Sequence, residues 1–452
     1  MISLHRIRLP WPTFALAAFL FVPSSWAQPV TLTPLKASGI YEIGEKIGWH
    51  VAVSEGQALA TVNYTLKKNG LTVYQTDTLD LSSGHATIVT SLDEPGAVLL
   101  EIQTPPAPEN APPAANTETG AAQGGRRRNR TQAGALVLPQ KLQPSSPRPA
   151  DFDAFWAAKI EQLHAIPANP QLTPGDSGKE NVDFALVRMD NIGDTHIYGQ
   201  LAKPKRGGKF PALLILQWAG VYPLQKNSVT ARAAEGWLTL NIEPHDLPCD
   251  QPAEFYRGKL TDPNYWTIGD EDKDRSYFLR MYLSAFRAAD FLAAQPDWDG
   301  KTLVVMGTSM GGQQTLATAG LHSKVTAMMA CVPSSCDLTG PEHGRAAGFP
   351  DWARSAKDKA NPKILETGQY FDPVNFASRI HVPALVAMGF IDETCPPAGV
   401  WSAINQMKGP TEPLPMINSP HQDNPKGVQR PWQTRSAEWL AILVKGEAVK
   451  FP

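Results

Sequence analysis

The chain has 452 residues, of which 42% are hydrophobic and 19% charged, and its formal net charge is −2. This length and composition predict a globular protein with more than one folding unit. The small net charge excludes an electrostatic basis for binding nucleic acid or an anionic membrane surface, so we expect a neutral substrate.

The first residues have the pattern of an export signal. Basic residues within the first eight positions precede an apolar stretch, residues 13–22, and Ser25-Trp26-Ala27 places small residues at the −3 and −1 positions of a cleavage site. A stretch of about ten residues is too short to span a bilayer, which takes about 20; the alternative is a retained anchor. We expect residues 1–27 to be removed as a signal peptide, leaving an exported protein, periplasmic or secreted, with no membrane anchor.

Residues 28–143 are predicted to form a small immunoglobulin-like β-sandwich. Short runs of alternating polar and apolar residues are separated by turn residues and show no helical period. Three of these runs are residues 46–53, 60–66 and 97–102. Residues 105–132 are rich in Pro, Ala, Gly, Asn and Thr and include an arginine cluster, so we predict a disordered loop that buries too little apolar surface to fold. Residues 135–138 are predicted to return to the sandwich as its last strand.

Residues 144–452 alternate between strand and helix patterns. One helix is expected to begin after Asp151 as N-cap, and another to span residues 277–294, where apolar residues recur at helical spacing. Several strand candidates are continuous apolar runs, which is typical of strands buried on both faces. The candidates are residues 182–189, 197–202, 212–216, 238–242, 303–306, 325–331, 384–388 and 415–418. The alternation predicts an α/β domain with a mostly parallel sheet.

The cysteine content indicates neither a disulfide scaffold nor a zinc site. The four cysteines form no C-x-x-C pair, and they are Cys249, Cys331, Cys336 and Cys395. In an oxidising compartment one bridge is feasible, and Cys331 and Cys336 are close enough in sequence to form it. We expect a structural role for all four, and no metal or other cofactor.

The strongest local motif is GTSMGG at residues 307–312. It follows an apolar strand and precedes a helix of small residues, which is the context of a nucleophile elbow. Ser309 must then sit in a strained turn, and side chains at positions 307 and 311 would collide with neighbouring backbone. The turn exposes the Ser309 hydroxyl above the sheet, next to a helix N-terminus.

A serine nucleophile needs a base, and the base needs an acid that holds its tautomer. In this fold the chain order is Ser, acid, His. His421 is the only histidine after the apolar run that ends at Asp392, so His421 and Asp392 are predicted to complete the triad with Ser309. Glu393 and Glu412 are rival acids; Glu393 would point to the opposite side of a continuous strand, and Glu412 lies near the next strand.

The oxyanion hole is predicted to use the backbone amide of Met310 and an amide from residues 217–222. Val221 is our choice for the second donor, and the neighbouring amides of Ala219, Gly220 and Tyr222 are alternatives. Aromatic side chains nearby are predicted to stack on a sugar, with packing as the alternative role. They are Trp218, Tyr222, Tyr265 and Trp266.

From Asp151 to about Leu443 the chain resembles the acetyl xylan esterase and cephalosporin C deacetylase family of carbohydrate esterases. The resemblance rests on DFDAFW (151–156), YFLRMYLSAFRA (277–288), GTSMGG (307–312) and IDETCPP (391–397). It implies an α/β-hydrolase fold and removal of acetyl groups from acetylated sugars by the same three side chains, without a metal.

Three positions depart from the family pattern. Residues 243–246, Glu-Pro-His-Asp, stand where the family commonly has Arg-Gly-Gln; Met310 replaces Gln after the nucleophile; and Gln422 replaces Glu after His421. The triad is intact, but the departures leave the substrate and the family's ring-shaped hexamer open. The N-terminal sandwich is an addition to the compact family members.

These observations predict a secreted serine carboxylic-ester hydrolase that removes acetyl groups from xylan or xylooligosaccharides through an acyl-enzyme. The alternatives are a serine peptidase or broad ester and amide hydrolase of the same fold, or a polysaccharide-binding protein that acts through the sandwich. The expected partner is an acylated carbohydrate or another small ester; formation of a homo-oligomer is left open.

Overall fold

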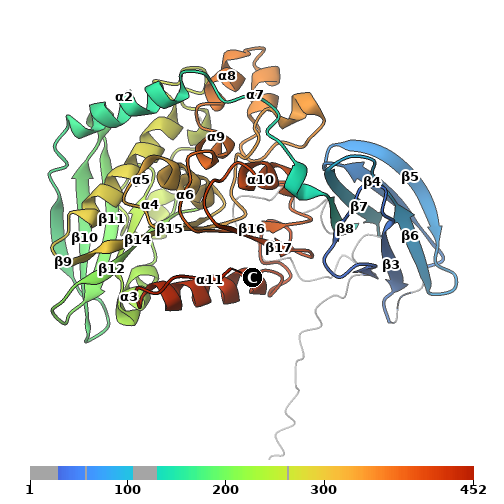
Figure 1. Cartoon of the computed structure of the whole chain (residues 1–452), viewed down its shortest axis with the longest axis horizontal. Coiled ribbons are helices and arrows are strands. Elements are labelled where there is room, and N and C mark those ends of the chain that lie inside the picture. The colour runs from blue at the N-terminus through green and yellow to red at the C-terminus, as the bar shows by residue number, and fades with distance from the viewer. Residues whose placement is uncertain (1–28, 56, 58, 105–129, 262–263, 452) are drawn as a thin grey trace, which may run out of the picture.

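The computed structural model describes residues 29–55, 57, 59–104, 130–261 and 264–451. The predicted signal peptide, and the predicted disordered loop as far as residue 129, lie outside the described residues. Figure 1 shows two units along the chain, an all-strand unit near the N-terminus and a larger unit of strands and helices.

The first unit is built from two sheets that share one apolar core. The three-stranded sheet has the order β1 (Val30–Pro34), β3 (Ile47–Val53), β6 (His85–Thr90). The five-stranded sheet has the order β2 (Ile40–Tyr41), β8 (Arg130–Val137), β7 (Gly96–Gln103), β4 (Thr61–Lys68), β5 (Thr72–Asp80). Alternate residues of the strands point inward, and Trp49, Leu66 and Leu100 are buried between the sheets.

Strands are present at the three runs predicted from alternation, as β3, β4 and β7. The prediction of disorder was wrong for residues 130–132, which begin β8 and pair with β7. The composition of this segment could not predict the strand, because Arg130 forms ion pairs with carboxylates far away in sequence, those of Glu101 and Glu393.

The second unit contains a nine-stranded sheet. Its order is β17 (Thr411–Met416), β16 (Ala384–Gly389), β15 (Ala327–Cys331), β14 (Trp298–Thr308), β12 (Phe210–Leu216), β13 (Leu238–Glu243), β11 (His196–Pro204), β10 (Val182–Asp190), β9 (Gln171–Gly175). The six strands from β17 to β13 are parallel, and β11, β10 and β9 are antiparallel. The prediction of a mostly parallel sheet is confirmed.

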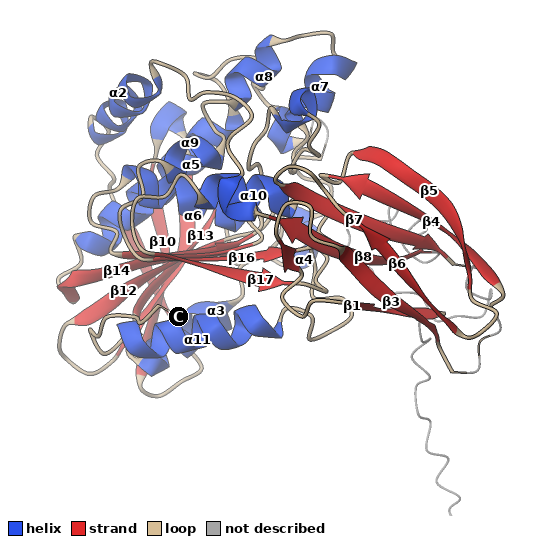
Figure 2. Cartoon of the chain, turned by 45° about the vertical axis from the view of Figure 1, so that its right-hand side comes forward, coloured by secondary structure: helices blue, strands red, loops and turns tan. Residues whose placement is uncertain are grey.

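Helices cover both faces of this sheet (Figures 1 and 2). On one face lie α5 (Tyr277–Ala293), α6 (Met310–Leu321), α9 (Pro373–Ala377) and α10 (Pro397–Ile404). On the other lie α3 (Lys226–Glu235) and α11 (Arg430–Leu443). The remaining α-helices of the described residues are α2 (Phe152–His164), α4 (Ala253–Tyr256), α7 (Trp352–Asp358) and α8 (Lys363–Gly368). None of the helices in the described part of the chain has both the length and the apolar character needed to cross a membrane.

Some boundaries differ from the sequence-based expectations. The last strand was predicted at residues 415–418, but β17 spans Thr411–Met416. Strand β9 was not predicted, because all five of its residues are exposed and show no apolar alternation. Helix α2 does begin after Asp151, yet the Asp151 side chain does not cap it. That carboxylate instead accepts hydrogen bonds from Tyr370 Oη (2.5 Å) and Lys273 Nζ (2.9 Å).

The first unit lies against the β16–β17 edge of the large sheet (Figures 1 and 2). Gly134 of β8 faces the backbone of Phe390 so closely that an added Cβ would lie 2.3 Å from the Phe390 carbonyl oxygen. Gln132 Nε2 donates to Glu393 Oε2 across the same interface (3.1 Å). The segment just after β16 is therefore held between the two units.

Candidate active site

Ser309 occupies a strained turn between β14 and α6. Its backbone has φ 57° and ψ −120°, a combination that non-glycine residues rarely adopt. The flanking glycines are required by space: a Cβ at Gly307 would lie 2.4 Å from the Gly311 backbone, and a Cβ at Gly311 would lie 2.2 Å from the Leu216 carbonyl oxygen. The sequence-based explanation of the GTSMGG motif is thus confirmed.

The structure brings Ser309, His421 and Asp392 into one hydrogen-bonded line. His421 Nε2 lies 2.9 Å from Ser309 Oγ, and His421 Nδ1 lies 2.8 Å from Asp392 Oδ2. The second Asp392 oxygen accepts the backbone N–H groups of Thr394 and Cys395, each at 2.8 Å. Because a carboxylate only accepts, Nδ1 carries the imidazole proton and Nε2 is left to accept the proton of the serine hydroxyl.

Each member of this line follows a different strand of the parallel sheet. Ser309 follows β14, Asp392 follows β16 and His421 follows β17, all at the carboxyl ends of the strands. Sites in α/β sheets form at this edge because the loops that leave parallel strands converge there. Ser309 and Asp392 are buried, with 6% and 3% of their surface exposed, so little water competes for these hydrogen bonds.

The two rival acids are engaged elsewhere. Glu393 accepts hydrogen bonds from Arg130 and Gln132 of the first unit. Glu412 accepts two from Arg435, at 2.7 and 2.8 Å, and one from the indole of Trp439. Of the three carboxylates considered from the sequence, Asp392 is therefore the one that hydrogen-bonds to His421.

The loop predicted to complete an oxyanion hole adjoins the elbow. Gln314 Nε2 in α6 donates to the Gln217 carbonyl (3.0 Å), and Gly311 packs on Leu216, so residues 217–222 leave β12 beside Ser309. The Gly220 N–H already donates to Tyr265 Oη (3.2 Å). Four backbone amides of this loop were considered as the second oxyanion donor. That of Gly220 already donates to Tyr265 and is therefore not available for this role.

The aromatic residues near the elbow divide into two kinds. Trp218 is 52% exposed and stacks on Tyr222, with ring centroids 5.4 Å apart and an interplanar angle of 27°. Trp266 is partly buried and meets Tyr265 and Phe349 edge to face. Tyr265 itself is 2% exposed; its ring belongs to the apolar core and its hydroxyl is used internally, which corresponds to the packing role considered as the alternative to sugar stacking.

Sequence reasoning missed a buried polar cluster at the end of β13. Glu243, His245 and Tyr277 are all nearly inaccessible, and burial raises the pKa of Glu243 well above its usual value. Burial lowers the pKa of His245 to about 4; the Gly220 carbonyl opposes this shift and Arg280 adds to it. The sequence did contain one indication of this cluster. Residues 243–246 lie at the end of β13, the strand next to β12, and they differ from the residues that the family commonly has at this place.

All four cysteines are buried free thiols, so the bridge that the spacing of Cys331 and Cys336 made feasible is not formed. Cys331 lies in the apolar cluster beneath α11 and Cys336 in the cluster on the opposite face of the sheet. Among the described residues, one group of three potential metal ligands comes within 4.8 Å, namely Asp392, Cys395 and His421. Two of these are bonded to each other, and burial raises the pKa of the Cys395 thiol well above its ordinary value, which disfavours the thiolate that a metal binds.

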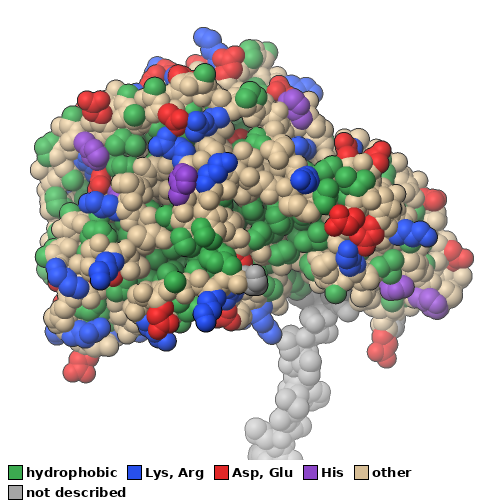
Figure 3. Space-filling model, viewed as in Figure 1, with side chains coloured by type: hydrophobic (Ala, Val, Ile, Leu, Met, Phe, Trp, Pro, Cys, Tyr) green, Lys and Arg blue, Asp and Glu red, His purple; other side chains and the backbone are tan. Residues whose placement is uncertain are grey.

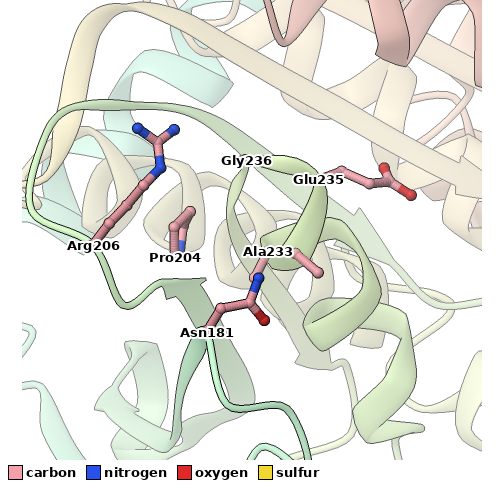
Figure 4. A pocket seen from close by; sticks show the side chains of 7 residues that line it. Asn181, Pro204, Arg206, Ala233, Glu235 and Gly236 are labelled. Carbon is pink, nitrogen blue, oxygen red and sulfur yellow. The ribbon is translucent and has the colours of Figure 1, made fainter.

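Figure 3 shows acidic and basic side chains interspersed over the face in view, without a large patch of one sign. The hollow in Figure 4 is lined by residues of the β10–β11 region and the end of α3, including Asn181, Arg206 and Glu235, and by none of the residues discussed above.

Comparison with known proteins agrees with this geometry. Residues 136–434 match the sequence profile of the acetyl xylan esterase family (AXE1). A curated protein, acetyl esterase Axe7A of Xylanibacter ruminicola, is 34% identical over 282 residues, which are 61% of this chain and 64% of the relative's length. This chain therefore spans less than two thirds of that relative.

Two solved structures show the same fold. The acetyl xylan esterase from Paenibacillus sp. R4 has a TM-score of 0.58 at 24% identity and covers 69% of this chain and 98% of its own. Acetyl xylan esterase 1 from Thermoanaerobacterium sp. JW/SL YS485 has a TM-score of 0.59 at 20% identity and covers 67% and 96%. The predicted α/β-hydrolase fold of the second unit is confirmed.

Proposed function

The chain belongs to the acetyl xylan esterase family, as its motifs indicated, and on this premise we propose that it is a serine ester hydrolase that removes acetyl groups from acetylated xylan or xylooligosaccharides. The observation that carries the proposal is the continuous hydrogen-bonded line from Asp392 through His421 to Ser309. Ser309, His421 and Asp392 act as nucleophile, base and orienting acid, and the reaction needs no metal or other cofactor.

In the first half-reaction His421 Nε2 takes the Ser309 proton while Oγ bonds to the acetyl carbon. The carbonyl π electrons move onto oxygen, which accepts hydrogen bonds from the amide of Met310 and from a second amide in residues 217–222, for which we propose Val221. His421 then gives its proton to the sugar oxygen, the ester C–O bond breaks, and acetyl-Ser309 remains.

In the second half-reaction water replaces the sugar alcohol. His421 Nε2 takes a proton from the water as its oxygen attacks the acetyl carbon, and the same amides hold the oxyanion. The bond from the acetyl carbon to Ser309 Oγ then breaks, Oγ recovers the proton from His421, and acetate leaves. Trp218, with Tyr222 stacked on it, and Trp266 are proposed to bind the sugar part of the substrate.

We also propose the domain organisation that the sequence pattern indicates. Residues 1–27 are a signal peptide, so the protein is exported; residues 28–143 form an immunoglobulin-like sandwich, and residues 144–452 form the hydrolase domain. The two sheets with one shared core support the sandwich assignment. Whether several copies assemble is tested by sedimentation of the purified protein.

The test is to assay the wild type and Ser309→Ala on acetylated xylooligosaccharides, on longer acyl esters and on chromogenic peptide amides. We expect acetate release by the wild type, and a fall in kcat of at least about a thousandfold in Ser309→Ala with unchanged folding. Full esterase activity in Ser309→Ala would refute the mechanism. Cleavage of amides in preference to acetyl esters would assign the site to a peptidase instead.

A further inference from the structure

A buried polar cluster connects the end of β13 to the loop that follows β12. The cluster consists of His245, Tyr265 and Tyr277, whose exposed fractions are 3%, 2% and 3%, together with the backbone of Gly220. The side chains come from three separate segments of the chain, and their rings pack on one another. The centroid of His245 lies 4.6 Å from that of Tyr265 and 5.8 Å from that of Tyr277.

The protonation state of His245 follows from its partners. His245 Nε2 lies 2.8 Å from the Gly220 carbonyl oxygen, which only accepts, so Nε2 carries a proton. His245 Nδ1 lies 2.7 Å from Tyr277 Oη. Burial lowers the pKa of His245 to about 4, so the ring is neutral near pH 7 and Nδ1 can accept a hydrogen bond. The Tyr277 hydroxyl faces Nδ1 at 2.7 Å and the Pro244 carbonyl oxygen at 3.2 Å, and the shorter contact makes Nδ1 its main acceptor. A neutral imidazole thus links Tyr277 to Gly220.

The same peptide segment is also held through its N–H. Gly220 N–H donates to Tyr265 Oη (3.2 Å), and Tyr265 Oη in turn donates to Met310 Sδ (3.7 Å). Gly220 has φ +123°, a conformation that L-residues rarely adopt. Both polar groups of Gly220 are therefore fixed, by two side chains that lie outside its loop.

These contacts join the two parts of the proposed oxyanion hole. Met310 supplies one amide, and residues 217–222 supply the other. Trp218 in this loop is 52% exposed, so the loop is not held by burial alone. Oxyanion stabilisation depends on donors that are already placed before charge develops, because a loop that must reorganise loses part of the gain.

We propose that His245 is a positioning residue. It fixes the Gly220 carbonyl, so that the loop after β12 presents the Val221 amide to the oxyanion. Tyr265 shares this role through the Gly220 N–H, and Tyr277 orients the imidazole. The inference rests on the proposed esterase function and adds to it residues that do not touch the substrate.

The first experiment compares His245→Ala and His245→Gln with the wild type on p-nitrophenyl acetate. His245→Ala is expected to lower kcat by about 10- to 100-fold with little change in KM, because the lost interaction matters in the transition state. His245→Gln keeps an N–H donor for the Gly220 carbonyl and an acceptor for Tyr277, and is expected to recover most of the lost kcat.

A matched control is His322→Ala. His322 is equally buried, at 4% exposed, and bonds to Asp290 (3.1 Å) rather than to the loop. Loss of thermal stability with an unchanged kcat is expected. Equal losses of kcat in His245→Ala and His322→Ala, or no loss in His245→Ala, would overturn the positioning role.

If His245→Ala does not fold, Tyr265→Phe replaces it, since this change removes one hydroxyl and keeps the ring. A tenfold or greater loss of kcat at constant KM is again expected, and an unchanged kcat overturns the inference. Ser309→Ala separates the two proposals: if it abolishes activity while the cluster variants do not reduce kcat, only the positioning role fails.

Discussion

Arg130, the first residue of β8, donates hydrogen bonds to Glu393, the residue that follows Asp392 in the chain. Arg130 Nη1 also contacts Glu101 Oε1 at 2.5 Å, and Gln132 reaches both Glu101 and Glu393. Side chains of the first unit therefore hydrogen-bond to the segment that carries the candidate catalytic acid. We expect this contact to stabilise the packing of the two units against each other.

A double-mutant cycle measures this contact. Arg130→Gln and Glu393→Gln are expected to show a coupling of about 1–2 kcal/mol, since the two side chains are only 18% and 29% exposed and belong to a network. Thermal unfolding of the four proteins provides the measurement. Lys36 and Glu45, an exposed pair in the same unit, serve as the control and are expected to show no measurable coupling. Equal results for the two pairs would contradict the prediction.

The assignment of the acid is tested by amide substitutions. Asp392→Asn is expected to lower kcat by roughly 10³–10⁴, because an amide no longer holds the proton on His421 Nδ1. Glu393→Gln, which alters the adjacent carboxylate, is expected to keep kcat within about threefold of the wild type, since Glu393 bonds to the first unit. Steady-state kinetics on an acetyl ester distinguishes them. A larger effect at position 393 than at 392 would reverse the assignment.

The exposed Trp218 is expected to matter for sugars and not for simple esters. Trp218→Ala removes an aromatic face, which is worth about 0.5–1.5 kcal/mol, and is expected to raise KM for acetylated xylooligosaccharides by about 3- to 10-fold. KM for p-nitrophenyl acetate is expected to stay the same. Leu172→Ala, at another exposed apolar residue on β9, is the control. Parallel changes for both substrates would argue against a sugar-binding role.

The buried His245 makes stability depend on pH. Its folded pKa of about 4 lies below its unfolded value near 6.5, so its contribution is complete above pH 6.5 and is lost as the pH falls toward 4. At pH 5 the loss is about 2 kcal/mol. The groups that face it are Glu243, Tyr265, Tyr277 and Arg280, and they remain in the variant. Between pH 7 and pH 5, thermal unfolding of His245→Gln is expected to shift several degrees less than that of the wild type. An identical shift would disprove a neutral buried imidazole.

Thiol titration tests the cysteine assignment. In the native protein Ellman's reagent is expected to react slowly with all four thiols, since each is at most 3% exposed and burial raises their pKa, for Cys249 to about 12. After denaturation without reductant, four thiols per chain are expected. Two thiols would instead indicate one disulfide.

The sequence predicted the parts of the site that short-range rules control. The spacing of Gly307 and Gly311 follows from contacts within a few residues and one neighbouring strand, and His421 was identified by chain order alone. The burial of α5 was predicted because apolar residues recur along one stretch. Each of these signals is contained in a continuous piece of sequence.

The remainder depends on contacts between distant segments. His245 meets Gly220 and Tyr277 at separations of 25 and 32 residues, and no motif connects them. Arg130 resembled a residue of a solvated arginine cluster because its partner Glu393 lies 263 positions away. The Cys331–Cys336 bridge looked feasible by spacing alone, while the sheet places the two residues on opposite faces.

The glycines at the interface between the two units limit how the protein can be recombined. Because Gly134 has no side chain, the backbone of β8 packs directly on the backbone of Phe390. At Gly39 an added Cβ would lie 3.0 Å from the Phe390 ring and 3.3 Å from the Ile417 side chain. A chimera that grafts another leading domain onto this hydrolase would need glycine at both places. Without them, the graft would push against the strand end from which the acid projects.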